Sequence, residues 1–181
     1  MDNGASSYRR FLDGDKSAFD EIVNEYFHAL VFFINGYVHD VYASEDIAIE
    51  IFSDLFAYRK YNFKASLKTY LFMRGKSKAI DYIRKNRSRA ELPLSEASEN
   101  VSEEEGLEEK ILDSERKKKI SKAIEGLPEQ MRFVIHLAYF EDMSYKEIAM
   151  VMKIKPKQVD NLLYRAKKEL RERLLEDGEL F

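Results

Sequence analysis

The chain has 181 residues and a net charge of −3, with 35% charged residues against roughly 25% in typical soluble domains. It contains no cysteine, which excludes disulfide frameworks and thiolate metal sites and fits a reducing compartment. Its longest apolar run, residues 29–34, is far shorter than a membrane span of roughly 20 residues, and the N-terminus lacks the pattern of a secretory signal. We therefore expect a soluble, cytoplasmic protein with no membrane insertion.

Turn-forming residues are scarce, with 7 Gly and 3 Pro, and this composition predicts an all-α protein. Apolar residues recur at helical spacing over three long segments of the first ninety residues. We expect a helix over 16–38, a second that Ser44 caps, and a third that Ser66 caps and that runs into the basic residues 74–89. A short opening helix is expected around residues 8–12.

Helical spacing in the second half of the chain predicts four helices, over about 107–125, 128–140, 145–152 and 156–175. Gly126 ends the first of these, and Pro128 takes the first position of the next, where its missing N–H costs nothing. Ser144 and Glu147 have the spacing of a capping box before the third helix, and Pro156 begins the fourth. These two prolines fall at helix starts and the third, Pro93, falls in the acidic segment 91–112, so none interrupts a predicted helix.

Charge is distributed unevenly along the chain. Residues 1–90 and 111–181 each have a net charge of +2, whereas residues 91–110 hold 8 Glu and one Lys. The acidic segment has few large apolar residues, so burial cannot offset its chain entropy. We therefore predict two small helical domains, over 1–90 and 113–181, joined by an acidic flexible linker over 91–112.

The last two predicted helices have the proportions of a helix-turn-helix. The final helix carries an apolar stripe formed by Val159, Leu163, Ala166, Leu170 and Leu174. Its opposite face carries polar residues that suit DNA: Lys157, Gln158, Asn161, Arg165 and Lys168. Gln and Asn offer a paired donor and acceptor to a base edge, and Lys and Arg suit phosphates. The alternative is an ordinary amphipathic helix with a solvated polar face.

A second basic segment, residues 74–89, holds seven Lys and Arg against a single Asp. It is either a helix that docks on nucleic acid or a helix end whose cations suit the helix dipole. The nearby Tyr70, Phe72 and Tyr82 could stack on unpaired bases, although aromatic residues more often pack in cores.

The sequence contains no recognisable catalytic set. Three His residues are scattered over predicted helices, without an HExxH pattern or an acidic cluster, and no Gly-rich phosphate loop occurs. We therefore expect neither an enzyme nor a bound cofactor or metal.

Several stretches in order along the chain resemble one family. They are FDEIVNEY at 19–26, EDIAIEIF at 45–52, TYLF at 69–72, KAIDYIRK at 78–85, LPEQ at 127–130, YFE at 139–141, SYKEIA at 144–149 and LYRA at 163–166. Together with the acidic segment between them, they resemble a sigma-70-type RNA polymerase sigma factor of the small, two-domain extracytoplasmic-function (ECF) class. The two domains would correspond to sigma region 2 and to the helix-turn-helix of sigma region 4.

The resemblance implies promoter-specific transcription initiation with core RNA polymerase. The polymerase clamp would bind the helix at 45–56, through Asp46, Ile49, Glu50, Phe52 and Ser53. The −10 element would be contacted by Tyr70, Lys76, Ser77, Lys78, Arg84 and Lys85. The −35 major groove would be contacted by Ser144, Lys155, Lys157, Gln158, Asn161, Arg165 and Lys168, and the same domain would touch the polymerase flap. An anti-sigma factor is a common further partner in the family.

The chain departs from the family's usual residues at four positions. Ile49 stands where Gln is frequent, Ser77 where Asn is frequent, Lys153 where the turn usually has Gly, and Asp160 where a basic residue is common. Two other functions stay open: a helix-turn-helix regulator that binds operators without polymerase, and a helical adaptor that binds only proteins.

Overall fold

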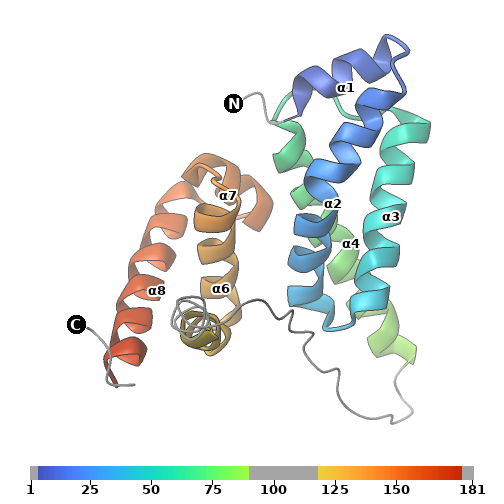
Figure 1. The fold of residues 1–181 in the computed structure, drawn as a ribbon. Helices are drawn as coiled ribbons and strands as arrows, with labels where there is room; N and C mark the ends of the chain where they lie inside the picture. Colours follow the sequence, from blue (N-terminus) through green and yellow to red (C-terminus); the bar gives the residue numbers. More distant parts are fainter. Residues whose placement is uncertain (1–3, 90–117, 177–181) are drawn as a thin grey trace, which may run out of the picture. The chain divides into compact units, whose positions relative to one another are not determined.

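The computed structural model describes residues 4–89 and 118–176, and every regular element in these two ranges is a helix (Figure 1). The prediction of an all-α protein is confirmed. Contacts divide the chain into two compact units, Met1–Ser98 with Lys146–Lys153, and Glu99–Tyr145 with Ile154–Phe181. The predicted acidic linker, 91–112, lies outside the described residues. None of the described helices is both long enough and apolar enough to cross a membrane.

Helix α2 is the centre of the first unit. The unit contains α1 (Ala5–Leu12), α2 (Ser17–Val38), α3 (Val41–Tyr58) and α4 (Leu67–Arg89), and α2 contacts each of the other three. Its Leu30 and Ile34 are fully buried. Gly75 of α4 faces them so closely that a Cβ there would lie 2.8 Å from Cδ1 of Leu30. The glycine thus allows α4 to approach α2 more closely than a larger residue would.

The predicted cap of α3 is wrong. Ser44 lies inside the helix, fully buried, and its Oγ donates to the carbonyl oxygen of Asp40 at 2.6 Å. The N-cap is Asp40, whose Oδ1 accepts from the backbone N–H of Ala43 at 3.0 Å. His39, with φ of 55°, ends α2 in the left-handed conformation, so the chain reverses within two residues and α3 starts early. The predicted cap of α4 is confirmed, because Ser66 Oγ accepts from Thr69 N–H at 3.1 Å.

Helix α1 is longer than predicted, and ionic contacts fasten it to the start of α2. The guanidinium group of Arg10 donates to Asp15 Oδ2 at 2.7 Å and to Glu21 Oε1 at 3.0 Å, and Ser7 Oγ donates to Glu21 at 3.0 Å. Hydrogen bonds from the Ser17 hydroxyl and then from Arg10 lower the pKa of Asp15 to about 2. The carboxylate form of Asp15 is therefore favoured by folding of this turn.

The second unit begins, within the described residues, with a helix that includes residues 118–125 and ends at Gly126. It continues with α6 (Glu129–Ile135) and a π-helix, η1 (His136–Phe140), in place of the single predicted helix. The backbone N–H of Glu141 donates to the carbonyl oxygen of His136, five residues back, which widens this last turn. Pro128 is the N-cap of α6 rather than its first residue, because its ψ of 140° is not helical.

Helices α7 (Tyr145–Met152) and α8 (Pro156–Glu176) start at the predicted residues. Three residues connect them, and the first, Lys153, has φ of 56°. The connection therefore keeps a left-handed residue where the sequence has Lys rather than Gly, at a cost of roughly 1 kcal/mol.

Candidate nucleic-acid interface

Helix α8 has one buried side and one exposed side, as the apolar spacing predicts. Val159, Leu163 and Ala166 are buried, and α8 packs against α6. On the exposed side, Lys157, Asn161 and Arg165 follow one another at intervals of four residues. Within the described part of the chain, the side chains of Lys157, Asn161 and Arg165 make no hydrogen bond or ion pair. Their donors are thus available along one edge of the helix.

Gln158, predicted to read a base, has a second role in the structure. Its side-chain Oε1 accepts a hydrogen bond from the backbone N–H of Lys155 at 2.8 Å. Lys155 immediately precedes α8, so this bond satisfies an N–H group that the start of the helix leaves without a partner. Gln158 is an exposed residue, so its NH₂ group keeps its donors for a base edge while the oxygen caps the helix. Lys155 and Ser144 are also exposed.

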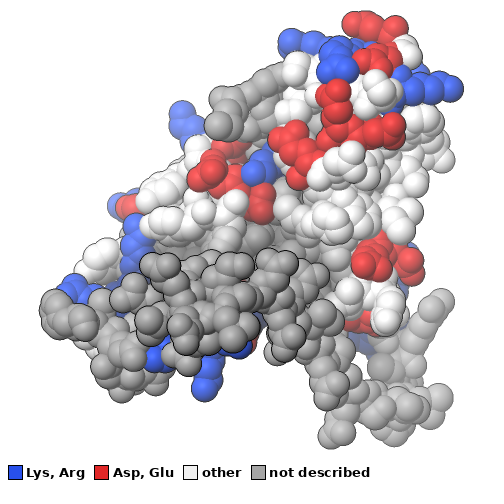
Figure 2. All heavy atoms as spheres, in the orientation of Figure 1, with Lys and Arg blue, Asp and Glu red and all other residues white. Residues whose placement is uncertain are grey.

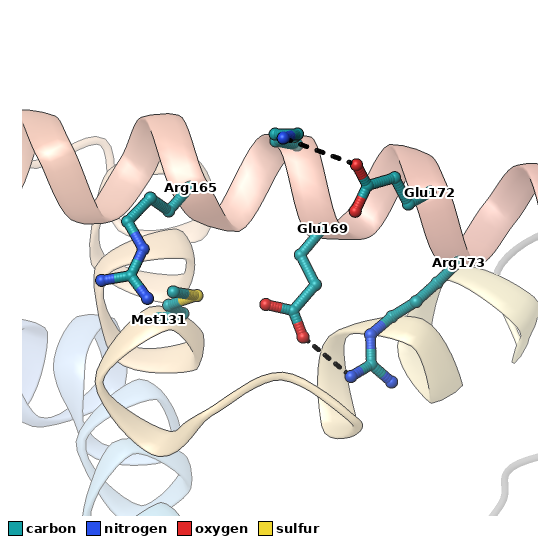
Figure 3. Close-up of a pocket in the computed structure, with 6 residues that line it drawn as sticks. Met131, Arg165, Glu169, Glu172 and Arg173 are labelled. Atoms are coloured by element: carbon teal, nitrogen blue, oxygen red, sulfur yellow. Dashed lines mark hydrogen bonds and ion pairs between the residues drawn. The ribbon is translucent and has the colours of Figure 1, made fainter.

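The second half of α8 is less suited to phosphates. Lys168 forms an ion pair with Glu172 at 3.8 Å, and Arg173 forms one with Glu169 at 2.8 Å (Figure 3). These four residues, together with Met131 of α6 and Arg165, line a groove of about 590 Å³. The carboxylates of Glu169 and Glu172 would repel the phosphates of DNA. The part of α8 that can approach DNA is therefore limited to its first turns.

Lys167 points to another neighbour. Its ammonium group lies 5.4 Å from the ring centroid of Tyr139 in η1. A hydrogen bond with the Tyr139 hydroxyl is the main cause that raises the pKa of Lys167, so its ammonium group stays charged beside the ring.

On α4, two basic side chains are held by carboxylates of α3. Lys78 pairs with Glu50 and with Asp54, and Arg74 also pairs with Asp54 at 3.4 Å. The side chain of Lys78 is only 18% exposed. Lys78 was predicted at the −10 contact and Glu50 at the clamp contact, and the structure joins the two across the α3–α4 interface. Their pairing ties the helices together and lowers the charge available to DNA from this part of α4.

The later turns of α4 are more open. Arg84 is bound to Asp81 at 2.8 Å, whereas Lys85 and Arg87 are exposed and make no ion pair in the region that the structure describes. Of the other predicted −10 residues, Lys76 and Ser77 are half-buried. Acidic and basic side chains lie intermixed on the face of the molecule shown in Figure 2. Among the described residues of α4, the exposed cations without an ion pair are thus confined to a short stretch near the end of the helix.

The aromatic residues near α4 divide between core and surface. Phe72 is fully buried and packs on Phe33, with ring centroids 5.0 Å apart. It is therefore a core residue, the alternative to base stacking that the sequence left open. Tyr70 is half-buried, with its ring 5.4 Å from that of Tyr61. Tyr82 is half-buried as well.

The predicted clamp residues do not all lie on the surface of α3. Asp46 and Ser53 are exposed, and Ile49 is an exposed apolar residue with 53% of its surface accessible. Phe52 instead lies in the core, 5% exposed, with its ring near those of Phe19 and Phe27. The exposed members recur every three or four residues and form one strip along the helix.

One surface was missed from the sequence: the loop between α3 and α4, residues 59–66. Here Lys60 lies 4.9 Å from the ring centroid of Tyr58, which is 64% exposed, and Lys64 is exposed beside Phe63. Cations interleaved with exposed rings are the usual combination in proteins that bind single-stranded nucleic acid. The run YRKYNFK at 58–64 carries this alternation and would have identified the loop.

Comparisons with known proteins cover both units. Residues 22–89 match the family described as Sigma-70 region 2, and residues 117–170 match Sigma-70, region 4. The chain is 28% identical over 172 residues to the RNA polymerase sigma-H factor of Pseudomonas aeruginosa, covering 89% of this chain and 88% of that protein. It is 24% identical over 152 residues to the ECF sigma factor SigM of Bacillus subtilis, covering 84% of this chain and 92% of the relative.

Two solved structures have a similar fold. The sigma factor RpoE of Bartonella quintana, in complex with the anti-sigma factor NepR, gives a TM-score of 0.64 at 17% identity over 86% of this chain and 96% of its own. CnrH, in complex with the cytosolic domain of CnrY, gives 0.60 at 20% identity over 98% and 97%. On these matches, which together span more than half of its residues, the chain belongs to the sigma-70 family of RNA polymerase sigma factors, in the ECF class.

Proposed function

We propose that this sigma factor reads the −35 element with the first turns of α8. The observation that carries the proposal is the exposed row of Lys157, Asn161 and Arg165, whose side chains make no ion pair or hydrogen bond within residues 4–89 and 118–176. Asn161 offers a donor and an acceptor to a base edge, and the two cations suit phosphates on either side. Gln158 adds its NH₂ donors while its oxygen caps the helix.

The −10 element is assigned to the first unit. The proposal adds loop 59–66 to the predicted set, because its rings and cations suit an unpaired strand. Lys85 and Arg87, which are exposed near the end of α4, suit the adjoining duplex phosphates. Arg74 and Lys78 serve mainly to join α4 to α3 through Asp54.

The polymerase clamp is proposed to bind the exposed strip of α3, at Asp46, Ile49 and Ser53. Charge reversal by Asp46→Arg is expected to weaken binding to core enzyme while leaving the fold intact, because the residue is exposed. Glu25→Arg on α2 makes the same charge change at another exposed position and serves as the control. Equal affinity of both variants for core polymerase would remove the α3 strip from the interface.

In this proposal the chain makes and breaks no covalent bond and needs no cofactor, since the polymerase supplies the chemistry. The proposed contacts are few in each unit, so we expect weak binding to promoter DNA without polymerase. An anti-sigma partner is proposed as well, because one solved relative, the sigma factor RpoE of Bartonella quintana, is in complex with the anti-sigma factor NepR. Such a partner is expected to lower transcription in a reconstituted assay.

The test is run-off transcription from a promoter library with purified core polymerase, with and without this protein. Specific start sites that depend on the protein are the expected result. A tight operator complex formed without polymerase would instead favour a stand-alone helix-turn-helix regulator. Transcription that is unchanged after removal of residues 127–175 would favour an adaptor that binds only proteins.

A further inference from the structure

Helix α1 contacts the α3–α4 loop at Arg59, Tyr61 and Phe63. At the start of the loop, the Arg59 guanidinium lies 5.2 Å from the ring centroid of Phe11. In the middle, the ring of Phe63 lies 5.8 Å from that of Tyr8. Just beyond the loop, Leu67 packs so close to Gly4 that a Cβ at Gly4 would lie 3.0 Å from Leu67 Cδ2. Figure 1 shows α1 across the end of the α2–α4 bundle.

The loop itself is held in a conformation that its residues disfavour. Arg59 and Phe63 have φ of 50° and 59°, which is the left-handed region. For a bulky side chain such as Phe, this backbone costs free energy and persists only where surrounding contacts impose it. The contacts on Phe63 are the rings of Tyr8 and Tyr61 and the Arg9 guanidinium, whose Cζ lies 5.2 Å from the Phe63 ring centroid.

Helix α1 is also held by contacts outside the loop. The ring of Phe11 packs against those of Phe19 and Phe56, with centroids 4.9 and 5.2 Å apart, and Arg10 and Ser7 bind Glu21 of α2. The loop is therefore not the sole support of the helix. Helix α1 also lies before residue 22, where the match to Sigma-70 region 2 begins, so that match assigns it no role.

We propose that α1 is a positioning element for loop 59–66, and that Arg9 holds the Phe63 ring where it meets the unpaired strand of the promoter. The role in DNA binding rests on the proposed function, whereas the support of the loop by α1 does not. Arg9 is exposed, and within residues 4–89 and 118–176 the contact with the Phe63 ring is the one interaction given for its side chain outside α1. It can thus be changed without disturbing the core.

The support of the loop is tested in the free protein by limited trypsin digestion. Trypsin cleaves after Lys60 and Lys64, both exposed, and the initial rate follows how often the loop opens. An exposed cation–π contact is weak, so we expect Arg9→Ala to raise these rates by about two- to fivefold. Arg9→Lys keeps a cation over the ring and is expected to stay close to the wild-type rate. Lys16→Ala removes the same charge at an exposed position away from Phe63 and is the matched control.

The role in DNA binding is tested with holoenzyme and a single-stranded oligonucleotide that carries the non-template −10 sequence. Arg9→Ala is expected to weaken binding by about two- to fivefold, with rescue by Arg9→Lys and no change in affinity for core polymerase. Unchanged cleavage rates in Arg9→Ala would overturn the supporting role of α1. Faster cleavage with unchanged oligonucleotide affinity would overturn its role in positioning the loop for DNA. If the proposed function itself were wrong, the wild-type protein would give no specific start sites in run-off transcription.

Discussion

Replacing Gln158 by Glu separates helix capping from base recognition at one position. In the structure, the side-chain oxygen of Gln158 accepts from the backbone N–H of Lys155 at 2.8 Å, at the start of α8. A Glu side chain keeps this acceptor and places a negative charge in the first turn, where the helix dipole favours it. The same change removes the NH₂ donors that we assign to the −35 element.

Gln158→Glu is expected to stabilise α8 slightly and to weaken binding to the −35 element. The dipole favours the added charge by about 0.3–1 kcal/mol, so α8 should become slightly more stable. Gln158→Ala removes the capping bond and should cost about 0.5–1.5 kcal/mol. Loss of a hydrogen bond from the NH₂ group to a base edge costs about 0.5–1.5 kcal/mol, which corresponds to about 2- to 13-fold weaker binding to the preferred −35 sequence. Repulsion between the new carboxylate and phosphates adds to this loss.

Amide hydrogen exchange of the Lys155 N–H measures the first effect directly, because that amide is the donor of the capping bond. Exchange should be slow in wild type and Gln158→Glu and faster in Gln158→Ala. Run-off transcription by holoenzyme from promoters that vary in the −35 element measures the second effect. If Gln158→Glu exchanges as fast as Gln158→Ala, the capping argument is wrong. If it initiates as well as wild type from the preferred promoter, Gln158 does not read a base.

Three further predictions concern other surfaces. Asn161→Ala should reduce discrimination among −35 sequences by about 1–3 kcal/mol, whereas Lys157→Ala should weaken initiation about equally on all of them; promoter-library transcription separates these outcomes. Asp46→Arg should weaken core polymerase binding in a pull-down titration and leave the circular dichroism spectrum unchanged. Because the pKa of Asp15 is lowered to about 2, chiefly by the Ser17 hydroxyl, its contribution to stability should be present above about pH 4 and be lost as pH falls toward 2. Acid titration of wild type and Asp15→Asn, followed by circular dichroism, should therefore converge at about pH 2, and a constant difference between them would contradict the assignment.

The placement of the basic residues on α4 shows how charge in sequence differs from charge in space. The sequence presents seven cations over residues 74–89 as one basic segment. In the fold, Arg74 and Lys78 meet the carboxylates of Asp54 and Glu50, which are twenty or more residues earlier in the chain. Helical spacing cannot reveal such pairs, because they depend on which faces of α3 and α4 meet. Among the described basic side chains of this segment, only those of Lys85 and Arg87 are exposed and form no ion pair.

Local signals in the sequence were sufficient for the class of fold, for most helix starts and for the family. Apolar spacing, Ser66, Gly126 and Pro156 act through neighbours within a few residues, so their effect can be predicted without the fold. The start of α3 could not be predicted this way, since Asp40 and Ser44 are both good caps and the left-handed turn at His39 selects the earlier one. The contact of α1 with the α3–α4 loop and the burial of Phe52 were also decided by tertiary packing, because a ring or a cation finds its partner only when distant segments come together. The sequence thus determines which helices form and which family they belong to, and the packing of those helices determines which of their polar residues remain free to meet DNA and polymerase.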